Sequence, residues 1–235
     1  MLYYVQKLFF FYILYSVLGW IYESVLCSLR EKRFVNRGFL NGPYCPIYGA
    51  GSVMFLLILG REKNPLLIFI FGAIIACALE YATSYVMERL FKARWWDYSD
   101  FKYNLNGRIC LGAAAIFGAF ATFLIKALHP LVMHWTDMIY PPVFGALCIA
   151  LLITFTLDTV ISVIGITGLD KKLMAASSKP PDNVPSNTYP FFDRLSRQHI
   201  RLLKAFPKMK WANHTEAIES LRPSLNKSRN FNKYK

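Results

Sequence analysis

Five long apolar stretches constrain the fold of this chain more than any other feature. A helix that spans a bilayer needs about 20 apolar residues, and only helices or closed barrels satisfy every backbone polar group in lipid. None of the stretches alternates between apolar and polar residues as a barrel strand does. We therefore predict an all-α, polytopic membrane protein, a bundle of about five transmembrane helices at residues 8–29, 44–60, 66–87, 109–127 and 143–169.

Composition agrees with this prediction and divides the chain in two. Of 235 residues, 55% are hydrophobic and only 17% charged, whereas soluble domains contain about 25% charged residues. Residues 169–235 carry 14 Lys and Arg against 5 Asp and Glu, and residues 1–168 carry 13 against 9. We therefore expect a transmembrane domain at 1–170 and a basic cytoplasmic tail at 171–235.

The tail is expected to contain a Pro- and Ser-rich linker, residues 177–190, and an amphipathic helix at about 190–206. On a membrane protein, such a basic tail favours anionic lipid headgroups over nucleic acid as its partner. The alternative is that the helix packs on a partner or on its own domain.

Basic residues between the spans predict the orientation. With five spans, one side of the membrane receives four Lys and Arg, and the other receives nine even without the tail. Because Lys and Arg are enriched on the cytoplasmic side, the N-terminus is expected outside and the C-terminus in the cytoplasm.

Acidic residues inside the spans are the strongest indication of function. Glu23, Glu80 and Asp158 lie in the first, third and fifth spans, each on a face with small or polar residues at helical spacing. All three fall roughly 10–18 Å from the cytoplasmic boundary at about 1.5 Å per residue. A charge at such depth needs a partner, and Arg108 at the start of the fourth span is the natural cation. These four residues are therefore candidates for one substrate- or ion-binding cluster; the alternative is independent structural pairs.

The second span has a broken beginning. Residues 38–51 contain two prolines and four glycines, so the backbone before Pro46 cannot be regular helix. Irregular backbone at membrane depth is tolerated where it is buried in protein or lines a cavity, whereas a tight turn between helices is the simpler explanation. On the first explanation, four residues join the binding candidates: Asn41, Tyr44, Cys45 and Tyr48.

Further polar and aromatic residues follow the first and third spans. They are expected at the membrane interface or at a partner-docking surface, and they are Trp95, Trp96, Asp97, Tyr98, Arg33 and Arg37. The sequence contains no phosphate-binding loop of the GxxxxGK[ST] type, and its four His and five Cys have no metal-ligand spacing. We therefore predict no cofactor, no metal site and no catalytic residue.

Several sequence words, in order over roughly residues 8–170, resemble one family of bacterial multi-pass membrane proteins. They are Gly19–Glu23 (GWIYE), Phe34–Leu40 (FVNRGFL), Gly42–Gly49 (GPYCPIYG), Trp95–Ser99 (WWDYS) and Asn104–Leu111 (NLNGRICL). The family is named as type IV ABC-transporter permeases. The resemblance implies a bacterial inner-membrane protein with a role in transport, whose ATPase is a separate chain.

Three functions are compatible with these features. The first is a membrane component of a transport system, in which case an oligomer is expected because five spans are few for a pore. The second is a cytoplasmic-face membrane enzyme acting on a lipid or lipid-linked substrate, since the candidate groups share one side. The third is a membrane assembly or regulatory protein. The sequence leaves enzymatic activity open and favours a role without it.

Overall fold

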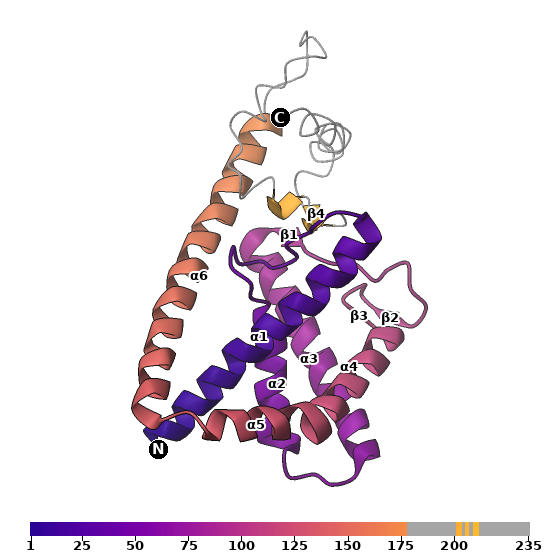
Figure 1. Ribbon diagram of the computed structural model, residues 1–235. Helices are drawn as coiled ribbons and strands as arrows, with labels where there is room; N and C mark the ends of the chain where they lie inside the picture. Colours follow the sequence, from indigo (N-terminus) through magenta and orange to yellow (C-terminus); the bar gives the residue numbers. More distant parts are fainter. Residues whose placement is uncertain (178–200, 204, 207–208, 212–235) are drawn as a thin grey trace.

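The computed structural model describes residues 1–177, 201–203, 205–206 and 209–211, and within them the fold is all-α (Figure 1). The α-helices are α1 (Leu2–Glu31), α2 (Pro46–Leu59), α3 (Pro65–Phe91), α4 (Leu111–Phe123), α5 (His129–Asp137) and α6 (Pro141–Ser177). A π-helical turn, η1 (Leu124–Leu128), joins α4 to α5. The remaining elements are two-residue strands: β1 (Ala93–Arg94), β2 (Asn104–Leu105), β3 (Ile109–Cys110) and β4 (Lys210–Trp211). The predicted all-α polytopic class is confirmed.

Four helical runs in the described residues are long and apolar enough to cross a membrane. They are Leu2–Glu31, Pro65–Phe91, Leu111–Asp137 and Pro141–Thr167. The second predicted span is a shorter helix, since α2 has 14 residues and a length of about 21 Å against the roughly 30 Å of a bilayer core. The chain is thus a multi-pass membrane protein in which one helix reaches only part of the way across.

The fourth span is longer than the predicted 109–127. Helix α4 continues through η1 into α5 and ends at Asp137. Pro130 has no N–H to donate within this continuous run, and the π-turn directly before it accommodates the proline and redirects the axis. In Figure 1, α5 consequently lies across the end of the bundle near the N-terminus.

The core of the bundle is formed where α1, α2, α3 and the α4–η1 run meet. Its buried residues are Phe11, Tyr15, Phe55, Leu59, Ile68, Ala121, Leu124 and Ile125. Small residues allow α3 and α4 to approach closely: a Cβ on Gly72 would lie 2.4 Å from the Cβ of Ala121. By contrast, α6 begins beside the N-terminal half of α1, then diverges from it along the edge of the molecule and exposes a long apolar surface, as expected of a helix that faces lipid (Figure 1).

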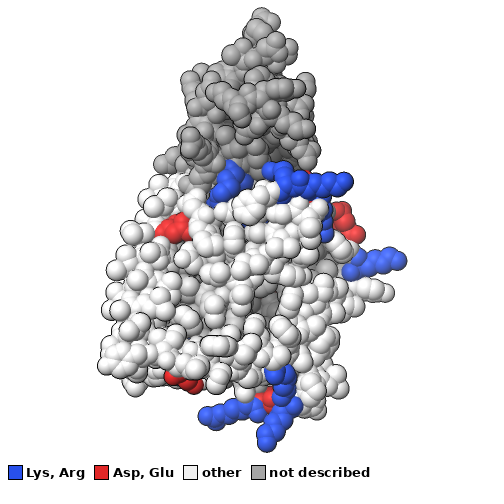
Figure 2. Space-filling view, viewed as in Figure 1, with Lys and Arg blue, Asp and Glu red and all other residues white. Residues whose placement is uncertain are grey.

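Charged residues lie at the two ends of the bundle. Figure 2 shows Lys, Arg, Asp and Glu gathered near the top and the bottom of the visible face, with an almost uncharged band between them. We call the upper end, with the connection 32–45 and the strand pairs β1–β4 and β2–β3, the basic end. At the other end, Lys7 pairs with Asp137, and Lys126 Nζ donates to the carbonyl oxygens of Glu62 and Lys63.

Part of the tail packs on the basic end. Strand β4 pairs antiparallel with β1, and Leu202 and Leu203 are 0% and 7% exposed in a cluster with Trp95 and Ile166. For the described part of the predicted amphipathic helix, the apolar side chains therefore contact the protein's own domain and not lipid. The predicted linker, and the predicted helix up to residue 200, lie outside the described residues.

Candidate functional site

The chain enters α2 from non-helical backbone that lies at membrane depth. The Cys45 N–H donates to the Ser16 carbonyl oxygen at 2.9 Å, which places the start of α2 beside the middle of α1. The two helices almost touch, because a Cβ on Gly49 would lie 2.2 Å from Ser16 Oγ. Glycine at this position thus lets α2 lie against α1 and brings Tyr48 next to Glu23.

Asp158 of α6 holds this entry loop in place. Its two carboxylate oxygens accept the backbone N–H groups of Asn41, at 3.1 Å, and Gly42, at 2.8 Å. Asn41 also donates its side-chain amide to Ser162 Oγ, one turn further along α6, at 3.0 Å. Because these N–H groups have no helical carbonyl to pair with, Asp158 caps the loop and is not a free acid.

Tyr44 and Cys45 complete the entry loop. The Tyr44 ring packs edge-on against Phe155 of α6, with ring centroids 5.4 Å apart. Cys45 is 9% exposed at the N-terminus of α2. Asn41 and Tyr44 thus connect the loop to Asp158, Ser162 and Phe155 of α6.

Glu23 is the acid that α1 contributes. Tyr48 Oη donates a hydrogen bond to Glu23 Oε1 at 2.6 Å, and Arg37 Nε lies 3.8 Å from Glu23 Oε2. The Glu23 side chain is 31% exposed. Glu23 therefore has both a hydroxyl donor and a nearby cation, which partly compensate its charge.

Glu80, on α3, has a different environment. It is only 7% exposed, and Tyr98 Oη donates to its Oε1 at 3.0 Å. Its Oε2 is buried and has no hydrogen-bond partner in the described part of the chain. Glu23 is close enough to act electrostatically on Glu80, and it adds negative charge. Glu80 is thus a buried acid with one carboxylate oxygen that accepts no hydrogen bond from the described residues.

Arg108 does not serve as the cation for Glu80. Its guanidinium donates to Ser84 Oγ at 2.9 Å and lies 2.7 Å from Glu88 Oε2, and Arg94 Nε lies 3.2 Å from the same oxygen. The guanidinium of Arg108 also lies 5.6 Å from the ring centroids of both Tyr81 and Tyr85. These contacts fasten the β2–β3 hairpin to α3.

The single polar cluster expected from the sequence is therefore divided into three. Glu23 acts electrostatically on Glu80, whereas Asp158 caps the entry loop and Arg108 pairs with Glu88. The reason for the last difference is depth: the hairpin meets α3 at Ser84 and Glu88, one to two helical turns nearer the basic end than Glu80. The spacing of Glu80, Ser84 and Glu88, which places all three on one face, was the signal for this contact.

The segment after α3, expected at the membrane interface or at a docking surface, has several side chains in contact with the rest of the protein. Trp95 is 3% exposed and packs edge-on against Phe206 of the tail, with centroids 4.8 Å apart. Trp96 Nε1 donates to the Arg108 carbonyl oxygen at 3.1 Å, and Tyr98 donates to Glu80. Tyr98 thus belongs to the acid site, and sequence reasoning assigned it elsewhere because its partner lies 18 residues away across a turn.

The remaining residues expected at the interface, Arg33, Asp97 and Arg37, also contact other residues of the protein. Arg33 Nη2 lies 3.6 Å from Glu31 Oε2, and Asp97 accepts hydrogen bonds from the backbone and side chain of Ser99. Arg37 donates to the Ala205 carbonyl oxygen in addition to its contact with Glu23. A single guanidinium thus connects the tail to the acid on α1.

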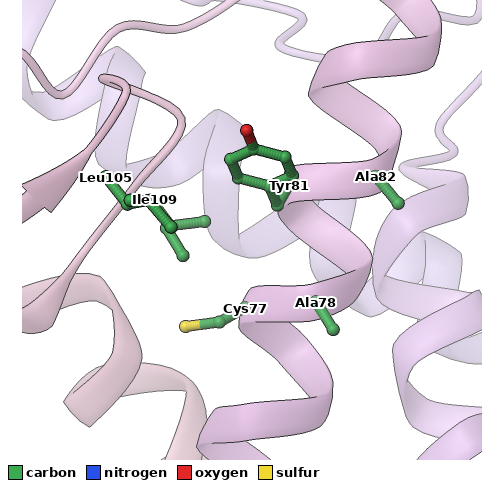
Figure 3. Close-up of a pocket in the computed structure, with 6 residues that line it drawn as sticks. All are labelled: Cys77, Ala78, Tyr81, Ala82, Leu105 and Ile109. Atoms are coloured by element: carbon green, nitrogen blue, oxygen red, sulfur yellow. The ribbon is translucent and has the colours of Figure 1, made fainter.

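A groove of about 360 Å³ opens between α3 and the β2–β3 hairpin (Figure 3). Cys77 and Tyr81 project from α3 toward Leu105 and Ile109 of the hairpin. The groove is nearly all apolar and contains none of the acids. Among the described residues, no three His, Cys, Asp or Glu side chains are placed to hold a metal ion.

One known protein family matches most of this chain. A family model described as "Putative ABC-transporter type IV" matches residues 10–163. The chain belongs to this family. The matched range includes Glu23, Glu80, Arg108 and Asp158 but ends before the tail. Neither a curated protein nor a solved structure matches the chain.

Proposed function

We propose that the chain is the membrane component of a bacterial ABC-type transport system whose ATPase is a separate chain. Membership of the family supports a transport role, and the sequence has no phosphate-binding loop of its own. The observation that carries the proposal is that two acids inside the matched range, Glu23 and Glu80, lie on helices long and apolar enough to cross a membrane, and that Glu80 is only 7% exposed. Intramembrane acids of this kind are typical of substrate or ion pathways.

We place the protein in the inner membrane with its N-terminus outside. The support is the excess of Lys and Arg at the basic end, which the positive-inside rule assigns to the cytoplasm. An ATPase would then dock on the basic end, where the connection 32–45 and the hairpin lie. Because few helices surround the acids in one chain, the working unit is an oligomer.

Single-cysteine labelling of intact cells tests the orientation. In a background without the five native cysteines, sites near Lys63 and Asp137 should react with a membrane-impermeant maleimide, and a site at Ser178 should react only after lysis. Labelling of Ser178 in intact cells would overturn the orientation and the cytoplasmic docking surface with it.

Reconstitution tests the transport role. The chain is co-expressed with a candidate ATPase subunit from the same genome, purified as a complex and placed in liposomes. The proposal expects a stable complex whose ATP hydrolysis depends on this chain and falls at least tenfold in Glu23→Gln, while Lys126→Gln, at the other end of the bundle, leaves it unchanged. A chain that binds no ATPase and changes no hydrolysis rate would contradict the proposal.

A lipid-directed enzyme is the second candidate function, and the groove of Figure 3 is what favours it. Its apolar lining suits an acyl chain, and two cations, Arg108 of the hairpin and Arg94 of β1, lie nearby where they meet Glu88 of α3. Turnover of radiolabelled lipid by the purified chain alone, without ATPase or ATP, would favour this function over transport.

A further inference from the structure

The charges around Glu80 do not balance within the described part of the chain. Glu88 has two guanidinium partners, Arg94 and Arg108, and Glu23 has Arg37. Glu80 has no ion-pair partner among the described residues, although it is the most deeply buried of these three acids. Glu80 lies 11 residues before the C-terminal end of α3, which is about 16 Å along the helix axis from that end. An ionised carboxylate there has a cost of several kcal/mol unless a positive charge joins it.

The surroundings of Glu80 specify which positive charge it takes. Its Oε1 already accepts the Tyr98 hydroxyl, so Oε2 is the single free ligand atom, and it is buried with no partner in the described residues. Among the titratable groups around Glu80, Tyr98 from the connection after α3 donates to it, Glu23 from α1 adds negative charge, and the Cys77 thiol on α3 is near enough to be affected by it. None of these three supplies a cation. One free oxygen with no further ligand in place suits a proton and is too few for a metal ion.

We propose that Glu80 is the proton-binding residue of the membrane domain. Its carboxylate takes a proton from hydronium when the site is open to water, forming the carboxylic acid and releasing one water molecule. The reverse step returns the proton to water when the site opens again. The bond that forms and breaks is O–H at Oε2, and no oxidant or other co-reactant takes part.

Tyr98 and Glu23 control this step from opposite directions. Tyr98 donates to the carboxylate and so favours the ionised form, whereas the negative charge of Glu23 favours the protonated form. Burial and the nearby Glu80 raise the pKa of the Tyr98 hydroxyl, so Tyr98 remains a donor throughout the physiological range. Any titration of the site near neutral pH therefore belongs to the carboxyl groups. That the bound proton is coupled to solute movement rests on the proposed transport function, but proton binding itself does not.

Labelling with a hydrophobic carbodiimide tests the proposal without any transport assay. The reagent forms a stable adduct only with a protonated carboxyl group, and peptide mass spectrometry identifies the residue. With the full chain in nanodiscs, we expect labelling at Glu80 in excess of Glu23, Glu88 and Asp158, decreasing as pH rises. Glu88→Gln, on the same face of α3, is the matched control and should leave Glu80 labelling unchanged.

Two variants move the titration in opposite directions. Glu23→Gln removes a negative neighbour, so half-labelling should occur about one pH unit lower. Tyr98→Phe removes the donor to the carboxylate, so half-labelling should occur at a higher pH. A buried acid with a purely structural role would show neither shift.

Three outcomes would overturn the proposal. They are no adduct on Glu80 at any pH, labelling independent of pH, or protection of Glu80 by Na⁺ or K⁺ at constant pH, which would indicate a metal-cation site. Loss of ATP-coupled transport with intact pH-dependent labelling would instead refute only the transport function. The two proposals therefore fail separately.

Discussion

Two acids on the same face of α3, Glu80 and Glu88, have opposite electrostatic surroundings. Glu88 lies between the guanidinium groups of Arg94 and Arg108, at 3.2 Å and 2.7 Å. Glu80, two turns deeper, has a tyrosine hydroxyl on one oxygen and nothing on the other in the described residues. The more exposed acid is thus the better compensated one, since the Glu88 side chain is 32% exposed.

This difference separates a structural charge from one available for chemistry. The Glu88 network joins α3, the strand β1 and the hairpin, so each of its members contributes to the fold. A buried charge without a partner destabilises the folded state, and proteins tend to keep such groups where they bind or react. The predictions below test whether the two acids really differ in this way.

The largest effect is expected from removing the cation of the structural network. Arg108→Gln should lower the free energy of unfolding by about 3 kcal/mol, because it leaves Glu88 and Ser84 short of a buried partner. Thermal unfolding in detergent measures this loss. In the double variant with Glu88→Gln, the loss should be smaller than the sum of the single losses, whereas with Glu80→Gln the losses should add. Non-additivity with Glu80 would mean that the two networks are one.

A smaller loss is expected at the contact that brings Tyr48 to Glu23. A Cβ at Gly49 would lie 2.2 Å from Ser16 Oγ and 2.3 Å from the Tyr12 carbonyl oxygen, so α2 must move away from α1. Gly49→Ala should therefore cost about 2 kcal/mol of stability in the same unfolding assay. Gly112→Ala is the matched control, because nothing lies within 4 Å of that Cβ, and it should cost nothing. Equal effects at the two glycines would contradict the close approach of α1 and α2.

The sequence predicted the framework well, because hydrophobicity and backbone chemistry act locally. Apolar length predicted the four helical runs that are long enough to cross a membrane but overestimated the second span, and the prolines and glycines of residues 38–51 predicted the irregular start of α2. The acids could also be placed on helix faces by their spacing. None of this needed information from distant parts of the chain.

The pairing of charges could not be predicted, because it depends on where distant segments meet. Arg108 and Glu80 are close in predicted depth, yet the hairpin reaches α3 at Glu88. Trp95 has the composition of an interfacial anchor and is buried by Leu202 and Phe206, more than 100 residues later. Glu80 and Glu88 differ in depth by about two helical turns, and this difference decides which of them meets the cations. Counting Lys and Arg on each side of the membrane gives no information at that scale.

Arg37 allows the comparison to be extended to a third acid. It lies 3.8 Å from Glu23, and both side chains are partly exposed, so Arg37→Gln should cost only about 1 kcal/mol. The same change should leave Glu23, like Glu80, without a cationic partner among the described residues. We therefore expect Glu23 to gain a carbodiimide adduct in Arg37→Gln and Glu88 to gain none. If Glu23 stays unreactive, the missing cation does not explain the difference between the acids.

The smallest effect on stability is expected at Glu80 itself, although its side chain is more buried than that of Glu88. Gln at this position keeps an oxygen to accept the Tyr98 hydrogen bond and removes a carboxyl group that has no cationic partner in the described residues. Glu80→Gln should therefore change the free energy of unfolding by less than about 1 kcal/mol, and in the stabilising direction at high pH, where the carboxylate would otherwise be ionised. Glu88→Gln removes the anion that two guanidinium groups share and should therefore destabilise the fold. Unfolding of both variants, measured from pH 5 to pH 9 in the same detergent, compares them directly. If Glu80→Gln loses as much stability as Glu88→Gln, the Glu80 carboxylate has a structural role like that of Glu88, with a partner other than Tyr98 and Glu23.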